Sequence, residues 1–299
     1  MSARHPIVAV TGSSGAGTSS TMAVFERIFR RLQVRAAVIE GDSFHRYDRN
    51  RMALEVEAAL KRGEELTHFG PSGNLFEELE RLFRTYSATG SGRRRHYVHT
   101  ESDAVHYGLP PGTLTDWEQL PPDTELLFYE GLHGGLKTDD HDIARHVDLL
   151  VGVVPIINLE WIQKIHRDRS VRGYSAEDAT QAILRRMSDY VHYICPQYSR
   201  TDVNFQRIPL VDTSNPFHAP AIPSSQESML VVHINNQSKM QTDFNALKSK
   251  ISGAFMSAPD TIVAPAEYYN LMVDVICSPV IERLLASRRD AQLEKIVSI

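Results

Sequence analysis

Near its start the chain reads Gly12-Ser13-Ser14-Gly15-Ala16-Gly17-Thr18-Ser19, and these glycines have the G-x-x-x-x-G spacing of a phosphate-binding loop. The apolar run 6–11 is typical of a buried strand, and apolar residues at helical spacing follow the loop. Backbone N–H groups in such a loop converge on phosphate oxygens, aided by the helix dipole. The alternative, a Gly/Ser-rich turn without a ligand, is disfavoured by both flanks. The predicted nucleotide-binding residues are Gly12, Ser13, Ser14, Gly15, Ala16, Gly17, Thr18, Ser19 and Ser20, and the Ser19 hydroxyl is also predicted to bind Mg²⁺.

Outward from this loop, apolar runs typical of strands alternate with charged segments typical of amphipathic helices. Such alternation predicts one α/β domain over residues 1–299, with a mostly parallel sheet flanked by helices. The helix expected at 175–193 begins with Ser175-Ala176-Glu177-Asp178, which resembles a capping box. Strands are expected at 6–11, 35–40, 125–131, 147–155, 208–211, 229–234 and 261–264, and the other helices at 22–32, 48–62, 73–86, 156–169 and 271–288.

The composition is that of an ordinary soluble globular protein, with 299 residues, of which 42% are hydrophobic and 23% charged. No run approaches the roughly 18 apolar residues of a membrane span, and the start lacks an apolar signal region, so we expect no membrane contact and a cytoplasmic location. The formal charge of -5 argues against broad nucleic-acid binding. Cys195 and Cys277 are too few for a disulfide framework or a cysteine-based zinc site.

One position of the loop departs from the general motif. Thr18 stands where a lysine normally reaches the β- and γ-phosphates. A cation of this kind is worth roughly 10³–10⁵ in rate, or about 4–7 kcal/mol of barrier. We therefore expect a lysine or arginine from later in the chain to take its place.

Two acidic residues follow strand candidates at the edge where the loop would lie. Glu130 ends one strand, where it could hold Mg²⁺ or its water shell; the alternative is a surface glutamate. Asp42 follows another strand, with His45 and Arg49 close behind. A carboxylate there can accept the proton of an attacking hydroxyl, while the basic residues fix an anionic substrate. The alternative for Asp42 is an Asx-turn.

Four segments together resemble the bacterial phosphoribulokinases, from the N-terminus to about residue 290. They are 10–19, 40–46, 127–134 and 154–168, which read VTGSSGAGTS, EGDSFHR, LFYEGLHG and VPIINLEWIQKIHRD. The threonine in place of the loop lysine also resembles the sequences of this bacterial branch. The resemblance implies a P-loop NTPase fold like that of nucleoside-monophosphate kinases. It also implies Mg-ATP-dependent phosphorylation of ribulose 5-phosphate at the C1 hydroxyl to ribulose 1,5-bisphosphate, in the Calvin cycle.

The resemblance implies a role for each of the residues near the first two strands. Asp42 would be the catalytic base on the C1 hydroxyl, and Glu130 would bind the metal ion. His45 and Arg49 would hold ribulose 5-phosphate.

The resemblance also implies Lys164 as the cation that replaces the loop lysine, with Asp168 in catalysis and Arg167 and Arg172 in substrate binding. Lys164, Arg167 and Asp168 lie at i, i+3 and i+4, so a helix would present them on one side. Without the resemblance, a solvated, salt-bridged helix face would be the better interpretation.

Tyr97 and His99 follow the basic run Arg93-Arg94-Arg95-His96. They fall where related enzymes contact the sugar phosphate, which makes them candidate substrate-binding residues. The alternative is a solvent-exposed basic loop.

Regulation is expected from the resemblance alone. It implies activation by NADH, inhibition by AMP and assembly into a large homo-oligomer, with Arg31, Arg185 and Arg186 at positions linked to the effector response. A charged helix face is the alternative for these arginines. Plant-type members use a cysteine pair near the active site, which this sequence lacks near the loop and Asp42, so thioredoxin control is not expected.

Two other functions stay open. One is a uridine-kinase-like or pantothenate-kinase-like enzyme that uses a different acceptor hydroxyl. The other is a non-catalytic nucleotide-binding regulator, which the joint presence of Asp42, Glu130 and Lys164 disfavours because a sensor needs no proton acceptor.

Overall fold

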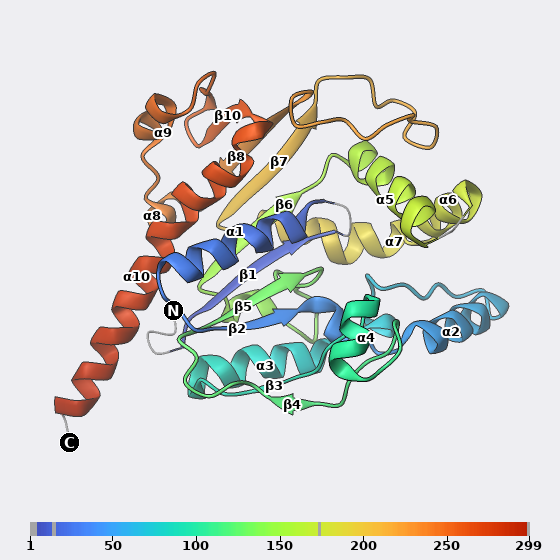
Figure 1. The fold of residues 1–299 in the computed structure, drawn as a ribbon, viewed down its shortest axis with the longest axis horizontal. Coiled ribbons are helices and arrows are strands. Elements are labelled where there is room, and N and C mark those ends of the chain that lie inside the picture. The colour runs from blue at the N-terminus through green and yellow to red at the C-terminus, as the bar shows by residue number, and fades with distance from the viewer. Residues whose placement is uncertain (1–4, 14–15, 173–174, 298–299) are drawn as a thin grey trace.

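An eight-stranded sheet forms the centre of the computed structural model, which describes residues 5–13, 16–172 and 175–297 (Figure 1). The strand order is β2-β5-β1-β6-β7-β8-β10-β9; the first five strands are parallel, and the remaining pairings are antiparallel. The predicted fold class is therefore confirmed, with an antiparallel extension at one edge. The bounds are β1 Ile7–Gly12, β2 Ala36–Glu40, β5 Leu126–Gly131, β6 Leu149–Val154, β7 Val203–Pro209, β8 Ser228–Ile234, β9 Phe255–Ala258 and β10 Thr261–Pro265, and a separate ladder pairs β3 Arg93–Arg94 with β4 Glu118–Gln119.

Helices lie on both faces of this sheet and beyond one of its edges (Figure 1). None of those in the described ranges is long and apolar enough to cross a bilayer. The α-helices are α1 Thr18–Arg31, α2 Arg49–Lys61, α3 Phe76–Thr89, α4 Glu101–Tyr107, α5 Ile157–Arg172, α6 Ala176–Arg185, α7 Met187–Asp189, α8 Gln237–Met240, α9 Phe244–Lys250 and α10 Tyr269–Val297, and the short 3-10 turns include η1 Gly41–Phe44 and η3 Ile143–His146.

Strand β1 is buried on both faces, and its successive side chains enter two separate cores. Val8 and Val10 belong to the core that contains α1 and α10. Ile7 and Ala9 belong to the opposite core, which contains α3. A continuous apolar run is what a central parallel strand requires, and this explains why β1 is readable from the sequence.

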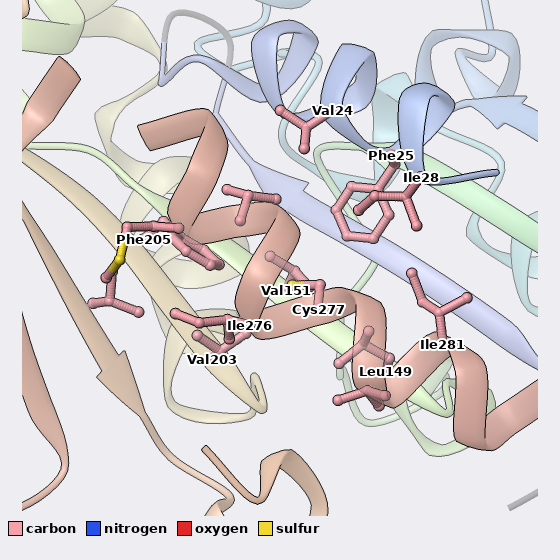
Figure 2. Packing of buried hydrophobic residues seen from close by; sticks show 14 of the residues in the cluster. Val24, Phe25, Ile28, Leu149, Val151, Val203, Phe205, Ile276, Cys277 and Ile281 are labelled. Atoms are coloured by element: carbon pink, nitrogen blue, oxygen red, sulfur yellow. The ribbon is translucent and has the colours of Figure 1, made fainter. Parts of the chain in front are cut away.

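Figure 2 shows the α10 side of the sheet, where helix and strand side chains interdigitate. Phe25 and Ile28 of α1 and Ile281 of α10 lie over Val151 of β6 and Phe205 of β7, and all five are essentially fully buried. Burying an apolar side chain of this size contributes about 1.5–3 kcal/mol relative to exposing it. The central strands are thus a rigid base for the loops at their ends.

The carboxyl ends of β1, β2, β5 and β6 meet at one edge because these strands run parallel. Register places Glu130 of β5 opposite both Val10 of β1 and Glu40 of β2. In Figure 1 this edge faces right, with α5, α6 and α7 above it and α2 and α4 below it. The predicted site residues that follow these strands are therefore neighbours in space.

The single helix expected at 175–193 is wrong in its extent. Ser175 does cap α6, because its hydroxyl accepts from the Asp178 amide, but α6 ends at Arg185 and is followed by α7 and a π-helical turn. Arg186 leaves helical geometry, with φ −93° and ψ 2°. Arg186 and Tyr190, on either side of α7, both reach Glu160, so the break coincides with a tertiary contact.

The strand expected at 208–211 is misplaced, because β7 runs over Val203–Pro209. Its buried residues Val203 and Phe205 alternate with polar ones, and this pattern is a weaker strand signal than the apolar run Ile208–Val211. The prediction was therefore placed at the carboxyl end of the strand. Strand β9, on the outer edge of the sheet, is short and mostly exposed and was not predicted.

Candidate active site

The loop after β1 is tightly packed where it is described. A Cβ added to Gly12 would lie 2.7 Å from Thr18 Cγ2 and 2.8 Å from the Val153 carbonyl oxygen, so no side chain fits there. Gly17 has a φ of 101°, a left-handed conformation that favours glycine, and it precedes the first turn of α1. Ser13 and Thr18 are buried, Ala16 is half-buried and Ser20 is exposed. Outside the described residues lie Ser14, Gly15 and the side chain of Ser19.

Glu130 lies at the carboxyl end of β5 and shares a hydrogen bond with the hydroxyl of Thr18, the residue that replaces the motif lysine. Burial raises the pKa of Glu130 to about 7, and the negative charges of Asp42 and Glu40 act in the same direction, against the Thr18 hydrogen bond. Carboxylates that repel one another are stabilised in their charged form by a divalent cation, which binds their oxygen atoms. This carboxylate therefore fits the metal-binding role predicted for it.

Asp42 lies in η1, immediately after β2, between two histidines. His45 Nε2 is 3.2 Å from Asp42 Oδ1, and His99 Nε2 is 3.6 Å from Asp42 Oδ2. Desolvation by the surrounding protein would raise the pKa of Asp42, but the charge and hydrogen bond of His45, together with His99 and His68, lower it below its ordinary value. Asp42 is thus held as a carboxylate whose two oxygens face different partners.

Aromatic rings surround His45, which is 6% exposed. The ring centroid of His68 lies 4.3 Å from that of His45, and that of Tyr97 lies 6.1 Å away. Tyr97 in turn contacts His99, with 4.8 Å between ring centroids. The structure therefore brings Tyr97 and His99 to Asp42, and it adds His68, which the sequence analysis did not single out.

The alternative of a solvent-exposed basic loop does not hold for Arg95, which is half-buried behind the Asp42 loop. Its guanidinium donates to the backbone carbonyls of Ser43 and His45. The same group lies 4.7 Å from the ring centroid of Trp117. Arg95 thus ties β3 and the region of Trp117 to the loop that carries Asp42.

The side chains of Glu160, Lys164 and Asp168 follow one another at i, i+4 and i+8 on α5. Lys164 and Asp168 form a buried ion pair. Glu160 is 1% exposed, accepts a hydrogen bond from the Tyr190 hydroxyl at 3.2 Å and lies 3.9 Å from Arg186. The alternative of a solvated, salt-bridged face is therefore wrong for Lys164 and Asp168. The i−4 spacing from Lys164 was the signal that could have found Glu160.

The other predicted substrate-binding arginines are less enclosed. Arg49 is the exposed first residue of α2, and its side chain packs against Gly112. Arg167 Nε lies 3.6 Å from Asp168 Oδ1. The side chain of Arg172 lies outside the part of the chain whose side chains are described.

The three predicted effector arginines have different surroundings. Arg31 forms a bidentate pair with Asp274 of α10, at 2.8 and 2.9 Å, and its partly exposed side chain joins α1 to α10. Arg185 is exposed at the end of α6. Arg186 is largely enclosed, with its guanidinium 4.7 Å from the ring centroid of Phe69. A charged helix face does not describe Arg186, and the effector role of all three stays a prediction.

Comparison with known proteins shows which family the chain resembles. The model of the phosphoribulokinase / uridine kinase family matches residues 7–214. The chain is 54% identical over 292 residues to the chromosomal phosphoribulokinase of Cupriavidus necator, which covers 97% of this chain and 99% of the relative. It is 51% identical over 289 residues to the phosphoribulokinase of Nitrobacter vulgaris, covering 96% of this chain and 99% of the relative. The solved structure of phosphoribulokinase from Rhodobacter spheroides matches with a TM-score of 0.88 and 47% identity, over 96% of this chain and 99% of that one.

Proposed function

We propose that this chain, which belongs to the phosphoribulokinase / uridine kinase family, transfers the γ-phosphoryl group of ATP to the C1 hydroxyl of ribulose 5-phosphate. The products are ribulose 1,5-bisphosphate and ADP, so the enzyme serves the reductive pentose phosphate (Calvin) cycle. The observation that carries this proposal is the Asp42 carboxylate, which lies at the sheet edge of the phosphate loop between His45 and His99.

Asp42 is the proton acceptor in this account. Its carboxylate is ionised, and its two oxygens face separate histidines, so it can take the proton of the C1 hydroxyl as that oxygen attacks the γ-phosphorus. A positioned base of this kind contributes about 10²–10⁴ in rate. His45, Tyr97 and His99 are the neighbouring groups that would hold the sugar phosphate, with Arg49 at the start of α2.

Lys164 supplies the positive charge that Thr18 cannot. It is buried beside Asp168 on α5, which follows β6 at the carboxyl edge of the sheet. A cation held in a low-dielectric site acts strongly on charge that develops on the transferred phosphoryl group. Asp168 holds the ammonium group of Lys164 in a fixed position, so that the group need not be reoriented when the phosphoryl group is transferred.

Mg²⁺, when bound, neutralises charge on the β- and γ-phosphates. Glu130 would hold this ion or its water shell, together with the hydroxyl of Ser19. Among the described residues, no group of three or more His, Cys, Asp or Glu forms a metal cage. That suits Mg²⁺, which usually takes one or two carboxylates, water and substrate phosphates as ligands.

We further propose that NADH activates and AMP inhibits a large homo-oligomeric enzyme in the cytoplasm. Two of the candidate effector arginines connect with nucleotide-binding elements. Arg31 joins α10 to α1, the helix that begins at the phosphate loop, and Arg186 contacts Glu160, one turn before Lys164. Replacing Arg31 with Ala should reduce activation by NADH, with Arg30→Ala as the matched control, since the Arg30 side chain bonds only within α1 in the described contacts. Light scattering measures the size of the assembly.

The direct test is ³¹P NMR of the products formed from Mg-ATP with ribulose 5-phosphate, uridine or pantothenate as acceptor. The proposal requires a bisphosphate with ribulose 5-phosphate and at least about 10²-fold slower transfer to the others, since a site built for a sugar phosphate leaves polar groups unpaired without it. Faster transfer to uridine or pantothenate would mean that this compound, and not ribulose 5-phosphate, is the acceptor. ATP binding without transfer to any of them would favour a regulatory protein.

A further inference from the structure

A buried asparagine faces the side of His45 that points away from Asp42. Asn74 is 2% exposed, and its side-chain Nδ2 donates to the carbonyl oxygens of His68 and Gly70 at 2.9 and 2.8 Å. Carbonyl oxygens only accept, so the two contacts fix which end of the amide is the NH₂ group. The amide oxygen must then be the atom that lies 3.0 Å from His45 Nδ1. A hydrogen on Nδ1 is required for this contact to be favourable.

The other ring nitrogen of His45 also faces an acceptor, because Nε2 lies 3.2 Å from Asp42 Oδ1. A neutral imidazole carries only one N–H, and it would direct a lone pair at either the amide oxygen or the carboxylate. Only the imidazolium donates to both partners. We propose that Asn74 is a positioning residue that keeps His45 protonated, so that His45 holds Asp42 Oδ1 and the acceptor hydroxyl meets Oδ2, which His99 approaches to 3.6 Å.

The backbone keeps Asn74 opposite His45. The two residues form an antiparallel bridge, flanked by hydrogen bonds from the Arg46 amide to the Gly73 carbonyl and from the Leu75 amide to the Phe44 carbonyl. A Cβ on Gly73 would lie 2.1 Å from the carbonyl oxygen of Thr67, so the turn before Asn74 is closed too tightly for a side chain. The amide is therefore placed by the fold and not by the ligand.

The groups around His45 agree with this charge state. Desolvation lowers the pKa of His45, and Arg95 acts in the same direction, but Asp42 and the Asn74 hydrogen bond raise it above the ordinary value. Desolvation and the charge of His45 lower the pKa of His68, which favours the neutral form of the neighbouring ring. The titratable and charged groups around His45 in the described residues include Asp42, His68, Arg95, Tyr97, the buried His133 and, across Asp42, His99.

The role of Asn74 rests on the proposed function only for its catalytic consequence, because the charge of His45 is measurable without any substrate. The readout is the ¹⁵N NMR titration of histidine-labelled full-length protein, with the His45 resonances assigned from a His45→Gln variant. In the wild type, both ring nitrogens should carry hydrogen to a higher pH than in an ordinary histidine. In Asn74→Leu, half-titration should move down by about one pH unit, the effect of losing a hydrogen bond to a charged group.

Two further variants separate positioning from mere loosening of the turn. Asn74→Asp keeps an acceptor for Nδ1 and adds a negative charge, so it should raise the titration to at least the wild-type pH even though it loses the NH₂ donor to His68 and Gly70. Thr67→Val removes the hydroxyl that accepts from the Phe69 amide at 2.9 Å and donates to Asp189 at 2.6 Å, so it loosens the same turn without touching His45. It should leave the His45 titration at the wild-type pH.

Activity supplies the second readout. In Asn74→Leu, kcat/KM for the sugar phosphate should begin to fall at a pH about one unit lower than in the wild type, while the KM for ATP stays constant. A neutral His45 in the wild type would overturn the proposal, as would an Asn74→Leu titration that matches the wild type or a Thr67→Val titration that matches Asn74→Leu. Failure to phosphorylate ribulose 5-phosphate would instead count against the proposed acceptor and leave the NMR result standing.

Discussion

The ammonium group of Lys164 lies against the carboxylate of Asp168, one helical turn further along α5, and the two side chains are 8% and 3% exposed. Desolvation lowers the pKa of Lys164 to about 8, and the charge of Arg186 acts in the same direction, whereas Asp168 raises it. The cation proposed to replace the loop lysine is therefore one that loses its charge just above neutral pH.

Activity should fall as the pH rises through about 8, because Lys164 acts in its protonated form and that form predominates below its pKa. Lys164→Arg should move this limb of the kcat/KM profile to higher pH, since a guanidinium stays charged. Lys164→Met should lower kcat by about 10³-fold below pH 8, and the difference from the wild type should shrink as the pH rises above the Lys164 pKa. Steady-state profiles of the three proteins check these expectations.

Lys239 is a matched control, because it also pairs with a buried carboxylate, that of Asp202 at 2.8 Å. Lys239→Met should keep both the wild-type rate and the limb near pH 8. If Lys164→Met retained more than a tenth of the wild-type kcat, another group would have to supply the charge.

Arg95 should be required for the geometry of the Asp42 loop, because its guanidinium holds the carbonyls of Ser43 and His45. Each hydrogen bond to a charged donor is worth about 1.5–3 kcal/mol, so losing both in Arg95→Ala should lower kcat/KM for ribulose 5-phosphate by at least about 10²-fold, with the Kd of ATP unchanged. Arg93→Ala is the control, since Arg93 is exposed and, among the described contacts, its side chain approaches only Trp117, at 5.9 Å. An equal loss of kcat/KM in both variants would mean that the rate depends on the positive charge of this segment and not on the hydrogen bonds from Arg95 to the Asp42 loop.

Gly12 should be needed for ATP binding, because an added Cβ would meet Thr18 and the Val153 carbonyl. Gly12→Ala should weaken ATP binding by at least about tenfold, since the loop must shift to relieve the contact and its N–H groups then miss the phosphates. Calorimetric titration measures the Kd.

The control is Gly63→Ala, where φ is 74° and no atom lies within 4 Å of the added Cβ. That variant should lose about 1–2 kcal/mol of unfolding free energy through backbone strain but keep its affinity for ATP. An unchanged Kd in Gly12→Ala would show that the loop adapts.

The sheet centre was predictable because its strands are continuous apolar runs next to glycines. Strand β1 and the phosphate loop are read from adjacent residues, and parallel strands bring Asp42 and Glu130 to the same edge without further information. The antiparallel extension was harder, because a strand such as β7 has one apolar residue in two and resembles a surface segment until its partner is known.

The groups that orient the catalytic residues could not be predicted in the same way. Asn74 and Arg95 act through contacts with His45 that span 29 and 50 positions of the chain. Their neighbours in sequence, a turn rich in glycine and a run of arginines, have commoner interpretations as surface loops. Only tertiary structure shows that these polar groups are buried and paired.

The most direct measurement is the turnover of Asp42→Asn with Mg-ATP and ribulose 5-phosphate, beside calorimetric titration of the same variant with ATP. The amide keeps the shape of the side chain but cannot accept the hydroxyl proton, so kcat should fall by about 10²-fold or more while the Kd of ATP stays within about twofold. A loss of less than tenfold, with ATP binding intact, would contradict the assignment of Asp42 as the base and the mechanism built on it.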